Sequence, residues 1–262
     1  MTELIDTHAH LDEFEELEPV LAKARDAGIK AIIAVGSGET SNQKILDICR
    51  NNPDFVFPSL GLHPWELGNL DDNQITHTIK SIEEKFQHIT TIGEIGLDYD
   101  KRVLKRTSKE QQKEILQRLI SIAKTYNKTI SIHSRYAWED CFNLVNDAGI
   151  KRAVFHWFTG FSSVLREIID AGYYISCTPA AEYHEEHQRA IKSTPLELLL
   201  LETDCPVTYG RENRYRSQPS DTLRSLRAAA LLKGTTEAII AEQTTHNAIA
   251  AFNLRLENHH SG

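Results

Sequence analysis

The sequence predicts an α/β protein built as a single-domain (β/α)8 barrel, the TIM-barrel fold. Three observations predict it: a length of 262 residues, short apolar runs that alternate with segments of helical period, and a total of eight such runs. The runs begin about 28 residues apart on average, which leaves room in each repeat for one strand, one helix and two short loops.

The eight apolar runs are the expected strands. They cover residues 4–7, 31–35, 55–60, 90–95, 129–132, 153–156, 173–177 and 198–202. Strands that alternate with helices in this way are typical of βα units around a parallel sheet.

Amphipathic segments between these runs are the expected helices. They cover residues 17–27, 43–51, 75–86, 109–126, 138–148, 164–171, 185–192, 220–232 and 236–252. Helix signals accompany several of them: Ser108 is a candidate N-cap, and Gly28, Gly149 and Gly234 follow predicted helix ends.

No Gly-, Ser- or Pro-rich linker divides the chain, so we expect one barrel over residues 1–256 and a disordered tail over 257–262. A doubly wound open sheet is the alternative architecture. However, none of the expected helices opens with a G-x-G-x-x-G or P-loop motif, which such folds use to bind nucleotides.

Composition excludes several classes of protein. Lys and Arg number 29 against 37 Asp and Glu, a net charge of −8, which argues against a broad basic surface for nucleic acid. No run approaches the ~20 apolar residues of a membrane-spanning helix, and the first residues do not resemble a secretory signal, so we expect a cytoplasmic protein. The four cysteines form no C-x-x-C pair, which disfavours zinc ribbons and disulfide frameworks.

Polar side chains follow the predicted strands where a barrel assembles its active site. His8 and His10 end the first strand two residues apart, so both imidazoles leave the same face. An H-x-H pair arises by chance roughly 0.5 times in a chain with this many histidines, so the pair alone is a weak signal. Further candidates end later strands, and the whole ligand set is His8, His10, Glu94, His133, His156 and Asp204.

Imidazole nitrogens and carboxylate oxygens suit Zn²⁺, Mn²⁺ or Mg²⁺. Six ligands exceed the needs of one catalytic metal that keeps an open coordination position. We therefore expect two divalent ions that share a carboxylate, and Glu94 is the expected bridge because it lies near the middle of the sheet.

At these motifs the sequence resembles the TatD-type metal-dependent deoxyribonucleases of the amidohydrolase superfamily. The matching segments are DTHAHLD at 6–12, GLHP at 61–64, GEIGLDY at 93–99, HSR at 133–135, HWFTG at 156–160 and LLETDCP at 200–206. The resemblance covers essentially the whole chain and implies a (β/α)8 barrel that hydrolyses DNA phosphodiesters with two divalent metals.

The resemblance also implies how the ligands are shared between the metals. One metal would take His8, His10, Glu94 and Asp204, and the other would take Glu94, His133 and His156. No Lys lies within residues 93–99, which argues against enzymes of this superfamily that bridge their metals with a carboxylated Lys. The chain departs from the usual family residues at Trp157, 178–181 and 216–219, which are loop positions where barrels select substrates.

We expect a metal-activated water to attack phosphorus, with Asp204 as its proton acceptor and Glu94 as the second catalytic carboxylate. His63, in the GLHP segment, is a candidate to donate to the substrate phosphate or the leaving oxygen. Glu202 is expected to contact a ligand histidine on the side away from the metal and so to hold it in place.

Candidate substrate-binding residues follow the strand ends. Arg135 is expected to clamp a phosphate, and Trp65 and Trp157 to stack bases of single-stranded or frayed DNA. Basic residues in the loops after the fourth and eighth strands would attract a polyanion locally. These residues are Lys101, Arg102, Lys105, Arg106, Arg211, Arg214 and Arg216.

Two other functions remain open. An ester or amide hydrolase, such as an enzyme that removes D-amino acids from transfer RNA, would use the same metals to attack carbon. A non-catalytic metal-binding scaffold is less consistent with six ligands around two metals. The sequence indicates no obligate protein partner.

Overall fold

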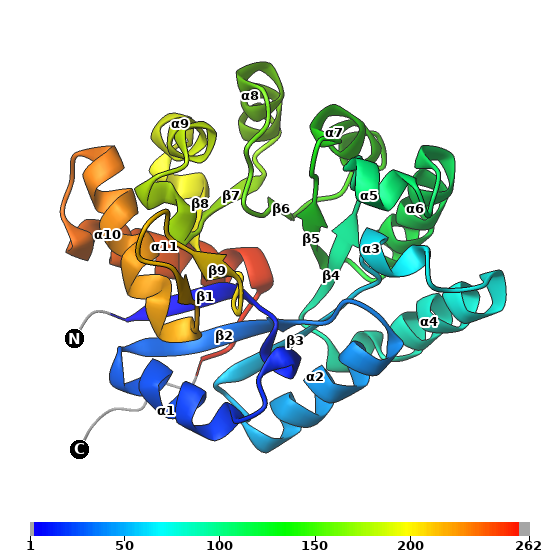
Figure 1. Ribbon diagram of the computed structural model, residues 1–262, viewed down its shortest axis with the longest axis horizontal. Helices are drawn as coiled ribbons and strands as arrows, with labels where there is room; N and C mark the ends of the chain where they lie inside the picture. Colours follow the sequence, from blue (N-terminus) through cyan, green and yellow to red (C-terminus); the bar gives the residue numbers. More distant parts are fainter. Residues whose placement is uncertain (1–2, 257–262) are drawn as a thin grey trace.

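Eight parallel strands form one sheet, in the order of the chain, in the computed structural model, which describes residues 3–256. The strands are β1 (Leu4–Ala9), β2 (Ile29–Val35), β3 (Val56–Leu60), β4 (Thr91–Gly96), β5 (Thr129–His133), β6 (Ala153–Phe155), β7 (Tyr174–Cys177) and β8 (Leu199–Leu201). Figure 1 shows the helices arranged around these strands. The predicted α/β barrel is confirmed, whereas the tail predicted at 257–262 lies outside the described residues.

The barrel is closed by the residues that follow β8 rather than by β8 itself. Ala9 and Cys205 form an isolated parallel bridge, and the backbone N–H of His10 donates to the carbonyl of Cys205 at 2.8 Å. The N–H of Asp204 donates to the carbonyl of His8 at 2.9 Å. These bonds lie at the carboxyl ends of both segments, so closing the barrel also places His8 and Asp204 side by side.

The helices lie on the outside of the sheet. They are α1 (Leu17–Asp26), α2 (Glu39–Asn51), α3 (Pro64–Leu67), α4 (Asp72–Glu84), α5 (Lys101–Leu104), α6 (Lys109–Thr125), α7 (Trp138–Asp147), α8 (Ser162–Asp170), α9 (Glu185–Ser193), α10 (Thr222–Lys233) and α11 (Glu237–Phe252). All nine predicted helices are present. The single-turn helices α3 and α5 follow β3 and β4 and were not predicted. Among the described residues no helix combines the length and the apolar character needed to span a bilayer.

Two apolar layers hold the barrel together. The larger one fills the space between the sheet and the surrounding helices. The smaller one joins inward-facing residues such as Ile5, Ile33 and Leu200 to Phe252 of α11. The hydroxyl of Thr129 also donates to the carbonyl of Ala251 at 2.5 Å. Helix α11 therefore covers the amino-terminal end of the barrel and leaves the carboxyl end open to solvent.

Residues 208–219, to which the sequence pattern assigns no helix or strand, contain a short hairpin beside the open end. Its strands β9 (Thr208–Tyr209) and β10 (Tyr215–Arg216) pair in antiparallel fashion. Tyr209 is fully buried, and its hydroxyl donates to the carbonyl of Thr203 at 2.9 Å. The hairpin is thus fixed to the segment that carries Asp204.

Candidate metal centre

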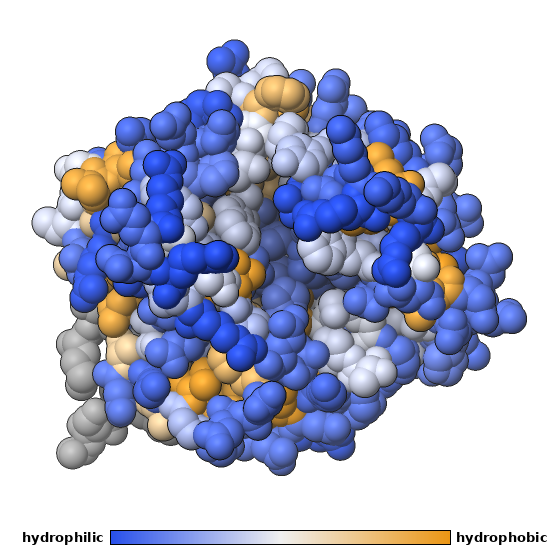
Figure 2. Space-filling model, in the orientation of Figure 1, coloured by the Kyte–Doolittle hydropathy of each residue, from blue (hydrophilic) through white to orange (hydrophobic). Residues whose placement is uncertain are grey.

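All six predicted ligands lie at or just beyond the carboxyl ends of the strands, and all except His8 line a cleft of about 610 Å³. The side chains at the base of the cleft are almost inaccessible to solvent: Glu94 is 3% exposed, His156 6% and Asp204 7%. Figure 2 shows the hollow near the middle of this face, with hydrophilic side chains on both sides of it. A buried group of imidazoles and carboxylates needs mutual pairing or a cation, because unpaired buried charge is costly.

Four donor atoms converge at one side of the cleft. His8 Nε2 and His10 Nε2 are 3.3 Å apart. Each nitrogen lies 3.4 Å from Glu94 Oε2. The distance to Asp204 Oδ1 is 3.6 Å from His8 Nε2 and 3.4 Å from His10 Nε2. His8 near the end of β1, His10 just after it, Glu94 in the middle of β4 and Asp204 after β8 supply this first donor set.

A second donor set surrounds the other oxygen of the same carboxylate. Glu94 Oε1 lies 2.8 Å from both His133 Nδ1 and His156 Nε2. His63 Nε2 is 3.4 Å from the same oxygen. The two oxygens of Glu94 therefore face two different groups of imidazoles.

The spacing of the donor atoms fits divalent metals. Ligand atoms at about 2.0–2.1 Å from a tetrahedral metal lie roughly 3.4 Å from one another, and the first donor set is spaced at 3.3–3.6 Å. Three groups of side chains could each hold a metal ion: His8, His10 and Asp204; His63, Glu94 and His133; and His8, His156 and Glu202. Divalent metal binding is therefore supported.

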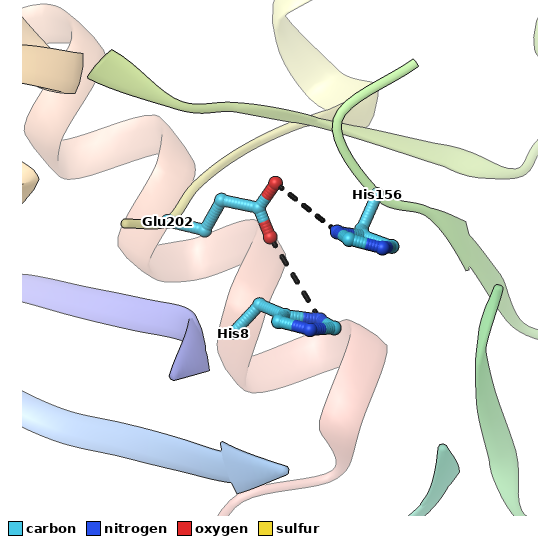
Figure 3. A group of neighbouring side chains, drawn as sticks. All are labelled: His8, His156 and Glu202. Atoms are coloured by element: carbon cyan, nitrogen blue, oxygen red, sulfur yellow. Dashed lines mark ion pairs between the residues drawn. The ribbon is translucent and has the colours of Figure 1, made fainter. Parts of the chain in front are cut away.

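Behind the donor sets, Glu202 faces the far nitrogens of two ligands. Its Oε1 lies 3.6 Å from His156 Nδ1 and its Oε2 lies 3.9 Å from His8 Nδ1. Figure 3 shows the carboxylate directed at both rings, which stack with centroids 4.0 Å apart. The N–H of Trp157 donates to Oε1 at 3.0 Å, and Glu202 is fully buried. Glu202 thus lies within 4 Å of both rings, and its supporting role stays a prediction.

Asp98 also contacts the predicted centre, although the sequence pattern assigns it no role. Its Oδ2 lies 2.9 Å from His133 Nε2 and accepts a hydrogen bond from Trp65 Nε1 at 2.6 Å. The side chain is fully buried. Asp98 follows β4 by two residues, so its position at a strand end was the available signal. One carboxylate thus orients a ligand of the centre and a tryptophan at the rim.

The electrostatics of the site favour ionised carboxylates. Burial alone would raise the pKa of Glu94, but electrostatic interactions with the His63 and His156 imidazoles and hydrogen bonds from His10 and His133 hold it well below its usual range. The pKa of Asp204 is also lowered, because hydrogen bonding to His10 and the nearby imidazoles outweigh burial. Both side chains are therefore ready to bind cations at neutral pH.

The pKa values of the imidazoles are shifted in different directions, depending on whether the nearby carboxylates or burial dominate. Burial would lower the pKa of His10, but hydrogen bonds with Asp204 and Glu94 raise it well above its usual value. The pKa of His156 is likewise raised, because Glu94 and Glu202 outweigh burial. For His63 burial dominates, and its pKa is lowered. The centre therefore holds positive charge close to its carboxylates, which is the position that a divalent cation would take.

His63 is fixed in orientation by the turn that it caps. It precedes α3, and its Nδ1 accepts the N–H of Trp65 at 3.1 Å. An imidazole nitrogen that accepts a hydrogen bond carries no proton, so the proton of neutral His63 lies on Nε2. That nitrogen faces Glu94 Oε1 and the cleft.

The other predicted substrate-binding residues lie at the rim of the cleft. Arg135, Trp65 and Trp157 all line it. Arg135 also lies 3.5 Å from Asp100, and the ring of Trp157 packs 5.4 Å from that of Tyr209. The backbone of Trp157 is left-handed, with φ of 40°, as is that of Asp204, with φ of 48°. Uncommon backbone conformations of this kind cluster at functional sites.

Basic residues from both predicted clusters are engaged by neighbouring groups. Arg102 pairs with Asp100 at 2.9 Å and lies over the ring of Trp65. Arg211 donates to the carbonyl of Tyr183. Arginines held by aromatic rings and carbonyls keep part of their guanidinium available for a phosphate.

A barrel with buried imidazoles and carboxylates at its carboxyl end is the architecture of a metal-dependent hydrolase. The TatD related DNase family matches residues 5–253, and the chain belongs to that family. The predicted resemblance is therefore confirmed.

Curated relatives and solved structures agree with this assignment. The chain is 34% identical over 260 residues to the human Deoxyribonuclease TATDN3, covering 95% of this chain and 94% of that protein. It is 27% identical to the 3'-5' ssDNA/RNA exonuclease TatD of Erwinia tasmaniensis, covering 92% of this chain and 95% of that protein. The crystal structure of the Escherichia coli TatD homologue YjjV superposes with a TM-score of 0.86 at 25% identity, covering 97% and 99% of the two chains. These relatives do not favour the alternative of a carbon-centred ester or amide hydrolase.

Proposed function

We propose that this chain is a metal-dependent exonuclease that hydrolyses phosphodiester bonds at the ends of single DNA strands. The observation that carries the proposal is the position of Glu94, whose two oxygens face two separate donor sets. The proposal is also supported by the nuclease names of the human and Erwinia relatives.

The two donor sets would hold two divalent ions, with Glu94 shared between them. His8, His10 and Asp204 complete the first set, and His133 and His156 complete the second. Nitrogen and oxygen donors of this kind accept Mg²⁺, Mn²⁺ or Zn²⁺. When bound, two such ions lower the pKa of a water molecule and polarise a phosphoryl oxygen.

Two side chains of the cleft would handle the proton and the phosphate. Asp204, an ionised carboxylate at the base of the cleft, accepts the proton of the attacking water as the oxygen–phosphorus bond forms. His63 donates a hydrogen bond from Nε2 to a phosphate oxygen or to the oxygen that leaves. The bond between phosphorus and that leaving oxygen then breaks, and the strand is shortened.

The depth of the centre favours strand ends over the interior of a duplex. The ligands lie at the base of a cleft of about 610 Å³, which is in the size range of pockets for small ligands. A scissile phosphate reaches them only if its nucleotide leaves the base stack. Unpaired or frayed ends do so at the lowest cost.

The test is cleavage of end-labelled single- and double-stranded DNA. Metal-stripped protein is supplied with Mg²⁺, Mn²⁺ or Zn²⁺ in turn, and products are resolved one nucleotide apart. We expect stepwise shortening of single strands that requires an added metal. Intact DNA with every metal, from protein that binds two ions, would refute the proposal.

Variants of single residues separate metal binding from proton transfer. His133→Ala removes a ligand and should abolish cleavage, whereas His77→Ala changes an exposed histidine on α4 and should have no effect. Asp204→Ala should abolish turnover even where some metal remains bound. Near-normal activity of the Asp204 variant would exclude its role as the proton acceptor.

A further inference from the structure

Aromatic side chains gather on the wall of the cleft formed by the segments after β5 and β6. Tyr136 and Trp138 line the cleft, and Phe161 packs on Trp138. The ring of Trp138 meets those of Tyr136 and Phe161 edge to face, at centroid distances of 5.8 and 5.2 Å and interplanar angles of 70° and 77°. We call Tyr136, Trp138 and Phe161 the aromatic ledge.

The ledge stands on a rigid support. Trp138 begins α7, packs against the core and lies 6.5 Å from the ring of the fully buried Phe158. Gly160 lets the indole lie against the backbone, because a Cβ there would come within 2.5 Å of Trp138 Cγ. Arg189 donates to the carbonyl of Gly160 at 2.6 Å and secures this turn. The position of the central ring is therefore set by packing before any ligand arrives.

The outer rings of the ledge are exposed to an unusual degree. Tyr136 is 56% exposed and Phe161 is 66% exposed. Among residues 3–256, the large apolar side chains with high exposure include three aromatic ones, and all three follow strands at the carboxyl end of the barrel. The third, Trp65, already bonds Asp98 and carries Arg102 over its ring. Exposed aromatic clusters at a cleft mark a binding surface.

A guanidinium lies next to the ledge in the cleft. Arg135 lies 5.5 Å from the ring of Tyr136, lines the cleft and exposes 40% of its side chain. A nucleotide likewise has a negatively charged phosphate next to a flat base, so it could contact the guanidinium and an aromatic ring together. The net charge of −8 gives the protein little general attraction for DNA, so stacking is the available source of affinity next to the scissile phosphate.

We propose that the aromatic ledge is a subsite that stacks unpaired nucleobases next to the phosphodiester bond that is cut. The proposal rests on the proposed nuclease function and adds the feature that selects single strands. In a duplex the faces of the bases are already covered by their neighbours, so only an unpaired base can stack on Tyr136 or Phe161. Trp138 positions these two rings from behind.

Binding is tested without requiring cleavage. The probe is a six-nucleotide single strand with phosphorothioate linkages and a 5′ fluorescein, titrated with the Mg²⁺-loaded protein and followed by fluorescence anisotropy. Tyr136→Ala and Phe161→Ala should each raise the Kd about tenfold, whereas Tyr136→Phe should leave it unchanged. Leu231→Ala on α10 is the matched control. Leu231 is an exposed apolar residue that does not line the cleft, so this substitution should not affect the Kd.

A strand with abasic positions shows whether the lost contact is with a base. It should bind the unchanged protein about tenfold more weakly, and the alanine variants should show no further loss. The proposal would be overturned if both alanine variants kept the Kd of the unchanged protein. It would also be overturned if the alanine substitutions weakened binding of the abasic strand as much as they weaken binding of the ordinary strand. Cleavage of ordinary DNA is measured separately, so failure of the ledge and failure of the nuclease proposal give different results.

Discussion

Glu202 illustrates how much of the centre depends on one side chain outside the donor sets. Its carboxylate faces the far nitrogens of His8 and His156, which belong to different donor sets. It is itself held by the N–H of Trp157. We expect a buried carboxylate in this position to orient both imidazoles and to keep their metal-facing nitrogens basic.

Replacing this carboxylate should weaken metal binding without removing a ligand. We expect Glu202→Gln to lower the affinity for Mn²⁺ about 10- to 100-fold, measured by competition with a fluorescent chelator. Glu197→Gln, an exposed site close in sequence, is the control. Unchanged affinity in the Glu202 variant would mean that the two imidazoles are oriented without it.

His187 makes a separate contribution that depends on pH. It is fully buried, with Nδ1 3.1 Å from the carbonyl of Phe158 and Nε2 accepting the N–H of Thr178 at 3.1 Å. Burial lowers its pKa to about 4. In the unfolded chain its pKa is about 6.5, so between these values protons bind preferentially to the unfolded state. The stability contributed above pH 6.5 is therefore lost as the pH falls toward 4.

The loss attributable to His187 is roughly 3 kcal/mol over that range. His187→Gln retains a hydrogen-bonding side chain that does not titrate, so its free energy of unfolding should decline less steeply from pH 6.5 to 4. Denaturant unfolding at several pH values measures both slopes, with the exposed His246→Gln as control. Parallel slopes for the His187 variant and the unchanged protein would contradict this explanation.

At the residue level, the sequence predicted six candidate ligands, Glu94 and five others, that the fold brings together. It could do so because a parallel barrel brings the carboxyl ends of its strands together, whatever their separation in the chain. The sequence did not identify Asp98 or the aromatic ledge. A pattern shows that a residue follows a strand, but it does not show which ring nitrogen that residue will meet.

At the level of elements, the repeating strands and long helices were predictable and their limits were less so. Helix α2 begins at Glu39 rather than at the predicted residue 43. The pattern missed its first turn because the residues of that turn are polar and add nothing to the apolar period. Helix α3 and the hairpin of β9 and β10 consist of too few residues to show any periodicity. Both lie beside the cleft, where tertiary contacts such as the one between Tyr209 and Thr203 fix them.

The β4–β5 pair shows how an element positions two members of the centre. Gly96 ends β4, pairs with His133 and has φ of 155°. A Cβ at Gly96 would lie 1.9 Å from the carbonyl oxygen of His133. Only glycine therefore allows the two strand ends to approach closely enough for Glu94 and His133 to meet.

A pair of glycine substitutions separates this close approach from backbone conformation alone. Gly172 also has positive φ, 76°, but a Cβ there would meet no atom within 4 Å. We expect Gly172→Ala to cost about 1 kcal/mol of unfolding free energy and Gly96→Ala to cost more than about 3 kcal/mol. Urea denaturation measures both, and equal costs would show that the contact with His133 does not constrain the fold.

At the level of the whole molecule, the centre exists only when the barrel closes. His8 comes from the first strand and Asp204 from the segment after the last, and backbone bonds between these two segments both close the barrel and bring the side chains together. The sequence predicted the barrel from its eight repeats. It did not show that residues 203–205 rather than β8 would complete the closure, because those residues carry no strand pattern.

The most direct measurement is anomalous X-ray diffraction at the manganese edge from crystals of the Mn²⁺-loaded protein. The account predicts two peaks for each chain, one at each oxygen of Glu94, the first beside His8, His10 and Asp204 and the second beside His133 and His156. A single peak, or two peaks that do not share Glu94, would contradict the claim that this carboxylate joins two metal ions.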